Sequence, residues 1–307
     1  MSIADQQVAV VRSALAGVNL ATRTMDFARL AKPGLTALAV VATFFGYWMG
    51  AAGDLHPGAL VGTLIGAVMI GAGANALNQY LEAEHDARMS RTAGRPLPSG
   101  RLTGSEVLSF SVVMFVVGVV YLALQANLLA ALLATIAWVS YGFVYTPLKR
   151  KTTYCVHIGA IPGALPPVIG WAAGAGSLSI GAAMLFGVLL VWQLPHFASI
   201  AWLYREDYER GGFKIISVRD ADGQKTSRHM LVYSLILLAV SLLPAIYGSS
   251  SYLYGVGAAL LGLAYLATGV WFRLCRTKEI ARLSLLASVT YLPCLFILMM
   301  IDKAFHT

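Results

Sequence analysis

The stretch ALVGTLIGAVMIGAGANALNQY, residues 59–80, decides the fold, because it stays apolar over most of its length and becomes polar only at its end. A helix needs about 20 mostly apolar residues to cross the hydrocarbon core of a bilayer. This stretch is long enough, and it continues directly into LEAEHDAR, residues 81–88, which carries three acidic groups. The sequence therefore predicts a transmembrane helix that delivers carboxylates to the membrane surface.

Eight further stretches have the same length and apolar character. The chain is 58% hydrophobic and 12% charged, whereas soluble domains carry about 25% charged residues. Its mean hydropathy is +0.71. The sequence therefore predicts an all-α polytopic membrane protein, and its other transmembrane helices are expected at residues 34–51, 107–125, 128–146, 156–174, 179–202, 230–247, 252–272 and 283–301.

The basic residues are segregated along the chain. If nine helices alternate in direction, every Lys and Arg except Lys303 falls on one side of the membrane. Basic residues favour the cytoplasmic side, so we expect a cytoplasmic N-terminus in a bacterial inner membrane, or a matrix location in an organelle. The net charge of +8 is thereby explained by the lipid bilayer, and no nucleic-acid partner is expected.

The long connections divide the chain into similar parts. Both long connections, at about residues 81–106 and 203–229, are predicted to be cytoplasmic, and four helices lie from the first to the second. This spacing suggests two four-helix halves arranged as parallel repeats, plus a ninth helix. We expect a cytoplasmic tail at residues 1–33, one transmembrane domain at 34–302 and a short tail at 303–307.

Asn78, Glu82 and Asp86 follow one another at intervals of four residues where the second apolar stretch ends. On a helix this spacing gives one polar stripe about 12 Å long. Carboxylates at a membrane helix end are costly unless they serve a function, and Mg²⁺ binds a few protein oxygens together with substrate phosphates. The stripe predicts a Mg²⁺ site; the alternative is a solvated helix end whose acids pair with Arg88 and Arg91.

Basic residues follow the acidic stripe. Arg91 and Arg95 lie in a connection bounded by Pro and Gly, and Lys149 and Arg150 follow Tyr145 in a second basic connection. Guanidinium groups bind phosphate through paired hydrogen bonds. Acids for a metal and bases for phosphate together predict a diphosphate site. The alternative for the second connection is a basic membrane anchor.

A third polar cluster is centred on the sixth apolar stretch. The sequence WQLPHF, residues 192–197, is followed by YREDYERGG, residues 204–212. His196 and Asp207 are eleven residues apart, or about three helical turns, so they share a face if the helix is straight. A histidine inside an apolar span is either bonded to a neighbouring helix as a structural residue or has a functional role.

Together these motifs resemble those of the UbiA-type intramembrane prenyltransferase family. The Asn78–Asp86 stripe matches the first motif of that family, and WQLPHF resembles the branch that acts on haem. Two departures are Glu82, where Asp is common in the family, and Gly211, which leaves a second acidic motif incomplete. The other matching segments are RTAGRPLPSG at 91–100, YTPLKR at 145–150, IPGALPP at 161–167 and GW at 170–171.

This resemblance implies transfer of a farnesyl group from farnesyl diphosphate to a vinyl group of protohaem IX, which gives haem O. Mg²⁺ is the implied cofactor, and a downstream haem-modifying enzyme is the candidate partner that receives the product. The implied catalytic residues are Asn78, Glu82, Asp86, Asp207 and His196. His196 is also the implied haem-binding residue. The implied metal site comprises Asn78, Glu82, Asp86, Glu206 and Asp207. Diphosphate is expected at Arg91, Arg95, Lys149, Arg150, Tyr145 and Arg205.

Two other functions are compatible with parts of the sequence. One is a prenyltransferase of the same fold that uses an aromatic or quinone-precursor acceptor; the 192–197 segment argues against it. The other is a haem-binding or transport protein without catalytic activity. The charges gather at one membrane face instead of along a path through the membrane, which favours a site that opens to one side.

Overall fold

The computed structural model describes residues 20–51, 53 and 55–306, and in this part of the chain it contains helices and no strands. Nine of these helices are long and apolar enough to cross a membrane, which confirms the predicted number. They are α3 (Pro33–Gly50), α4 (Pro57–Leu81), α6 (Gly104–Gln125), the α7–α8 span (Leu128–Leu148), α9 (Cys155–Ala175), α10 (Ile180–Leu203), α12 (Gln224–Ile246), α13 (Tyr252–Cys275) and α14 (Lys278–His306).

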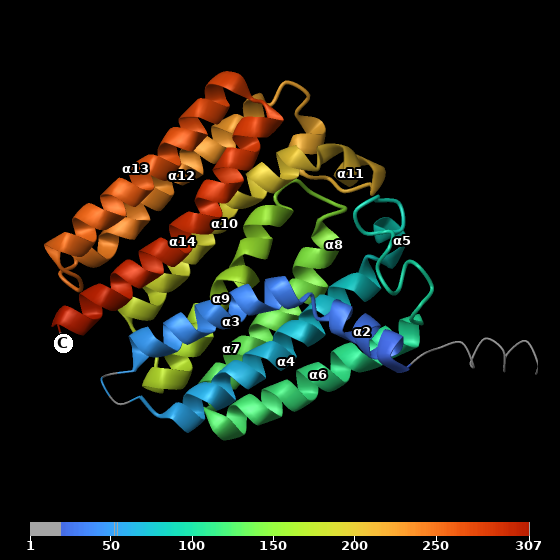
Figure 1. Ribbon diagram of the computed structural model, residues 1–307, viewed down its shortest axis with the longest axis horizontal. Coiled ribbons are helices and arrows are strands. Elements are labelled where there is room, and N and C mark those ends of the chain that lie inside the picture. Colours follow the sequence, from blue (N-terminus) through green and yellow to red (C-terminus); the bar gives the residue numbers. More distant parts are fainter. Residues whose placement is uncertain (1–19, 52, 54, 307) are drawn as a thin grey trace, which may run out of the picture.

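Short elements gather at one end of the bundle. In Figure 1, α5, α8 and α11 lie at the same end of the long helices, whereas the C-terminus lies at the opposite end. These elements occupy the two long connections and the end of the fourth span, where the sequence becomes charged. The bounds of the short helices, including α2 before the first span, are α2 (Leu20–Leu30), α5 (Ala83–Asp86), α8 (Thr146–Leu148), α11 (Arg205–Arg210) and the 3₁₀-helix η2 (Ile216–Arg219).

Close backbone contact joins α3 to α9 at the centre of the bundle. A Cβ atom added at Gly46 would overlap the carbonyl group of Pro167, and one added at Gly170 would overlap the carbonyl oxygen of Thr43. Small residues allow membrane helices to approach closely when no hydrophobic effect holds them together. The first span is thereby fixed against the helix that follows the second basic connection.

The outer faces of the bundle are apolar. On α6 the side chains of Val113, Val116 and Val120 are exposed, and Leu263 and Leu260 are exposed on α13. Large apolar surfaces of this kind are unfavourable in water, but they match the hydrocarbon interior of a bilayer. The chain is therefore a multi-pass membrane protein.

The ends of the chain differ in detail from the expected tails. Of the predicted tail at residues 1–33, residues 1–19 lie outside the described residues, and α2 forms part of the remainder. At the other terminus, α14 continues to His306, so the expected tail at 303–307 is helical over its described part. Among described Lys and Arg residues, only Lys303 lies at this end, where its Nζ donates to carbonyl oxygens at the end of α3, including that of Trp48 at 2.8 Å.

Candidate functional site

The acidic stripe lies at the junction of α4 and α5. The side chains of Asn78, Glu82 and Asp86 are 2%, 5% and 1% exposed, respectively. The α4 helix ends at Leu81, but the Glu82 amide still donates to the Asn78 carbonyl at 3.0 Å and the Asp86 amide to the Glu82 carbonyl at 2.8 Å. The helical spacing therefore continues across the junction, and all three polar groups are buried on one face, whereas Glu84 is exposed.

Arg95, in the connection after α5, forms an ion pair with Asp86, the last acid of the stripe. Arg95 Nη1 lies 2.5 Å from Asp86 Oδ2, and the Thr92 hydroxyl donates to the Asp86 carbonyl at 2.9 Å. Both contacts bridge only a few residues of a connection rich in turns. The sequence spacing of the acid and the arginine is thus realised as a local, largely buried ion pair.

The second basic connection reaches the stripe through an irregular helix. Residues Ser140–Tyr145 form a π-helix, and the Thr146 amide donates to the carbonyl of Tyr141, five residues earlier. Such wider turns recur at functional sites, and Pro147, which lacks an amide donor, follows at once. The turn delivers the Thr146 hydroxyl, which accepts from Asn78 Nδ2 at 3.3 Å, and Lys149, whose Nζ lies 2.9 Å from Glu82 Oε1.

Lys32, which belongs to the predicted tail at residues 1–33, is also part of the site. Its Nζ donates to Asn78 Oδ1 at 2.9 Å. Its backbone is left-handed, with φ +46°, immediately before Pro33, so the chain turns sharply as it enters the membrane. The signal in the sequence was a lysine next to a proline at the start of a span, but no spacing pattern linked it to a residue 46 positions away.

The electrostatics of the site reflect three cations and two carboxylates in a confined space. Burial, reinforced by the charges of Arg95 and Lys149, lowers the pKa of Lys32 to about 7. Burial also acts to lower the pKa of Lys149, but Glu82, Tyr145 and Tyr141 together outweigh burial and raise that pKa well above its usual value. Burial raises the pKa of Asp86 more than Arg95 lowers it. The surplus of positive charge favours an anionic ligand.

One oxygen of the site is suited to a cation. Asp86 Oδ1 is buried and has no hydrogen-bond partner among the described residues, which is costly for a carboxylate. Throughout residues 20–51, 53 and 55–306, no three His, Cys, Asp or Glu side chains lie close enough together to hold a metal ion by themselves. The residues present therefore fit a hard cation that takes part of its oxygen ligands from an amide, water or a phosphate.

The two acids of the second motif, Glu206 and Asp207, have different partners. Ser90 donates to Asp207 Oδ1 at 2.9 Å, and Arg210 pairs with the same carboxylate. Burial alone would raise the pKa of the Asp207 carboxyl. The contacts with Ser90 and Arg210 outweigh burial, and the pKa of Asp207 is lowered. Glu206 instead faces away from Asp207 toward Lys278 at 3.0 Å and is largely exposed. Only Asp207 is thus connected to the loop that follows the first acidic stripe.

Two further predicted diphosphate ligands, Tyr145 and Arg150, contact residues that lie next to the acids. The Tyr145 ring lies 4.6 Å from Lys149 Nζ. Arg150 Nη1 lies 3.2 Å from His85 Nε2, while the other ring nitrogen of His85 lies 2.7 Å from the Gly211 carbonyl oxygen. These contacts bring the two long connections and the second basic connection together.

Two predicted arginines make aromatic contacts instead. Arg91 lies over the ring of Tyr204 at 5.1 Å, and Arg205 lies over the ring of Trp202 at 4.5 Å. Stacking of this kind holds a guanidinium in place without neutralising its charge. Both arginines lie on the α11 side, and the acids of the α4 stripe pair with Arg95 and Lys149 instead.

His196 lies in the interior of α10, away from the charged end. Its ring stacks on Trp192 at 4.7 Å, and Nδ1 lies 2.7 Å from the hydroxyl of Ser288 on α14. Trp192 Nε1 donates to the Ser288 carbonyl at 2.9 Å. The Nδ1 atom therefore fixes the position of the ring, and any role toward a ligand falls to the other ring nitrogen, Nε2.

Known proteins similar to this chain cover nearly all of it. The chain is 45% identical to the protoheme IX farnesyltransferase of Solibacter usitatus, over 91% of this chain and 98% of the relative. It is 39% identical to the protoheme IX farnesyltransferase of Koribacter versatilis, over 99% of both chains.

Solved structures share the fold at low sequence identity. A structure from work on digeranylgeranylglyceryl phosphate synthase matches with a TM-score of 0.74 at 18% identity, over 92% of this chain and 98% of the other. A UbiA homologue from Archaeoglobus fulgidus, bound to DMAPP and Mg²⁺, matches with a TM-score of 0.63 at 16% identity, over 89% and 98%. The sequence profile of the UbiA prenyltransferase family matches residues 39–292, and the chain belongs to this family.

Proposed function

We propose that this prenyltransferase moves a farnesyl group from farnesyl diphosphate to a vinyl group of protohaem IX and so produces haem O. The observation that carries the prenyl-transfer part is the buried cluster at the end of α4. Glu82 and Asp86 meet Lys149 and Arg95 there, and one acid oxygen is left without a partner. A diphosphate and a divalent cation together satisfy both needs.

The choice of donor and acceptor is supported by the relatives. Proteins that are 39–45% identical over nine-tenths or more of this chain are named protoheme IX farnesyltransferases. Identity at this level over nearly full length supports a shared substrate pair. The A. fulgidus homologue was solved with DMAPP and with GPP, each with Mg²⁺, which supports a prenyl diphosphate and this metal in the same fold.

The stripe residues would hold Mg²⁺ at the end of α4. Asn78, Glu82 and Asp86 offer carboxylate and amide oxygens on one face, and Asp207 on α11 is hydrogen-bonded to Ser90 in the connection that follows the stripe. When bound, the metal would neutralise charge on the diphosphate oxygens. Glu206 faces Lys278 in this conformation, so we propose Asp207, in preference to Glu206, as the contribution of the second motif.

The cations of the cluster would act on the leaving group. As the farnesyl C1–O bond breaks, its electron pair goes to the diphosphate, and the negative charge on that group grows. Lys149 and Arg95 lie where they can exchange their carboxylate partners for phosphate oxygens, and Lys32 adds a third donor. Donors aimed at a developing charge are a principal source of rate enhancement.

The acceptor step then forms one carbon–carbon bond. The vinyl group of the porphyrin supplies its electron pair to farnesyl C1, and the resulting cation beside the ring takes up water, which loses a proton. His196 is the proposed acceptor-side residue, because Ser288 and Trp192 fix its ring deep in α10. Its Nε2 is suited either to an iron contact or to orienting that water.

The location of the site agrees with this chemistry. The cluster lies at the end of the bundle that carries nearly all basic residues, and we propose that this end faces the cytoplasm of a bacterial inner membrane. Farnesyl diphosphate would then place its diphosphate at the aqueous end and its chain among the helices. Haem O would leave within the membrane toward an enzyme that modifies haem further.

The proposed function predicts a new haem in a defined mixture. Membranes that contain the protein are incubated with protohaem IX, farnesyl diphosphate and Mg²⁺, and the haems are separated by chromatography and identified by mass. We expect haem O, and none when Mg²⁺ is chelated. Prenylation of 4-hydroxybenzoate in place of haem would contradict the acceptor assignment and support the quinone-precursor function.

The acidic stripe predicts a selective loss of turnover. We expect Glu82→Ala and Asp86→Ala each to lower kcat by about a hundredfold or more, because the charge that develops on the diphosphate is no longer neutralised. Glu84→Ala is the matched control: this acid lies in the same segment but is exposed, and its loss should leave turnover within about twofold. Near-normal turnover in both stripe variants would refute the metal assignment.

The bases predict a change in binding of the diphosphate substrate alone. We expect Arg95→Lys, which loses the paired guanidinium contacts, and Lys149→Ala, which loses a charged donor, to raise the KM for farnesyl diphosphate by about tenfold. The affinity for haem, measured by absorption, should not change. Lys151→Ala, an exposed lysine of the same connection, is the control. An unaltered KM in both site variants would mean that these bases only anchor the protein at the membrane surface.

A further inference from the structure

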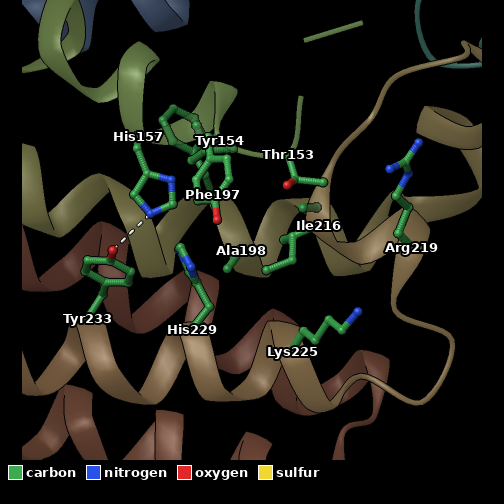
Figure 2. Close-up of a pocket in the computed structure, with 12 residues that line it drawn as sticks. Thr153, Tyr154, His157, Phe197, Ala198, Ile216, Arg219, Lys225, His229 and Tyr233 are labelled. Atoms are coloured by element: carbon green, nitrogen blue, oxygen red, sulfur yellow. Dashed lines mark hydrogen bonds between the residues drawn. The ribbon is translucent and has the colours of Figure 1, made fainter. Parts of the chain in front are cut away.

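A pocket lies between α9, α10, η2 and α12, and none of the stripe residues lines it. Its volume is about 520 Å³, and the residues that line it include His157, Phe197, Arg219, Lys225 and His229. Sites for cofactors and small ligands typically have volumes of about 300–1,000 Å³. Figure 2 shows that the pocket has two chemically different ends.

One end is built from imidazole and phenol groups. His157 Nε2 lies 2.9 Å from the hydroxyl of Tyr233, and the rings of His157 and His229 are 5.2 Å apart. His157 Nδ1 is buried and has no hydrogen-bond partner among the described residues. Because the two imidazole rings are in edge contact, no porphyrin fits between them, and one imidazole at a time can face a haem iron.

The other end is cationic. Arg219 and Lys225 lie on the far side of the pocket from His157 in Figure 2, with Ala198 and Ile216 between. Both basic side chains belong to exposed residues, and within the described part of the chain neither forms an ion pair. Their charges are therefore available to an anionic ligand.

Helix α12 explains why the two ends are in line. Lys225, His229 and Tyr233 are spaced by four residues, so they form a stripe about 12 Å long on one face of the helix. The stripe begins at the first turn of α12, beside the charged connections, and runs into the span. A ligand along it would have its anionic groups in the aqueous region and its apolar body in the membrane.

We propose that this pocket is a docking site for protohaem IX, with the iron facing the imidazole end formed by His157 and His229 and the propionates at Arg219 and Lys225. This inference rests on the proposed function, since it assigns a place to the acceptor. An anionic lipid would satisfy the cations but has no group for the two imidazoles. A free metal ion would satisfy the imidazoles but leaves the apolar middle and the cations without a partner.

The pocket is close to the diphosphate site along the chain. Thr153, which lines it, is four residues after Lys149, and the Lys214 amide donates to the Lys149 carbonyl at 2.8 Å just before η2. His196 faces Ser288 on α14 instead. A haem in this pocket would lie beside the connection that carries Lys149, and His196, which faces α14, would not contact its iron.

The test is a titration of the purified full chain with ferric protohaem IX, followed by absorption spectroscopy. We expect His157→Ala and His229→Ala to weaken binding by about tenfold or more and to shift the Soret band, as loss of a metal ligand does. His56→Ala is the matched control, because this histidine lies at the start of α4 outside both sites. Retained binding of farnesyl diphosphate shows that each variant is folded.

A second arm tests the cationic end. Arg219→Gln with Lys225→Gln should weaken binding of protohaem IX by about tenfold but should not change binding of its dimethyl ester, whose propionates are uncharged. An unchanged spectrum and affinity in the double variant His157→Ala/His229→Ala, or a change in His196→Ala alone, would overturn the pocket and leave the proposed function standing. Failure of the wild-type protein to bind haem at all would overturn both.

Discussion

The charge balance at the end of α4 is the constraint on which the rest of the site depends. Glu82 and Asp86 are nearly inaccessible to solvent, and each is held by a base from a different connection. A buried carboxylate that loses its partner costs about 3–5 kcal/mol. The two loops therefore cannot move away from the helix end without a replacement for these pairs, and a metal with a diphosphate is such a replacement.

Helix packing places these charges where they meet. The close contact of α3 with α9 at Gly46 and Gly170 fixes the first span, and Lys32 stands directly before that span. The π-helix at the end of the fourth span turns Thr146 and Lys149 toward the stripe. The site thus combines groups from rigid helix ends, which favours precise placement, with bases on connections that can exchange partners.

The transmembrane architecture could be predicted from the sequence because its signals are local. An apolar stretch of about 20 residues needs no information from elsewhere in the chain, and the nine predicted spans match the observed ones. The stripe at Asn78, Glu82 and Asp86 was predictable for the same reason: a four-residue spacing stays on one face as long as the helical hydrogen bonds continue, and they do.

The parts that were not predicted depend on contacts between distant segments. The hydrogen bond from Lys32 to Asn78 needs a left-handed residue before α3. The outward direction of Glu206 depends on Lys278, which belongs to another helix. The pairing of His157 with His229 and Tyr233 arises only when α9 packs near α12. The catalytic and binding roles of the site residues stay predictions until they are measured.

If the stripe is the catalytic site, metal and diphosphate bind to it as one unit. The most direct measurement is the affinity of the purified protein for Mn²⁺, a paramagnetic substitute for Mg²⁺, with and without inorganic diphosphate. We expect diphosphate to tighten Mn²⁺ binding by about tenfold or more and Mn²⁺ to tighten diphosphate binding by the same factor. The variant Glu82→Gln/Asp86→Asn should abolish this coupling. Equal Mn²⁺ affinity with and without diphosphate, or coupling that survives in this variant, would contradict this role of the stripe.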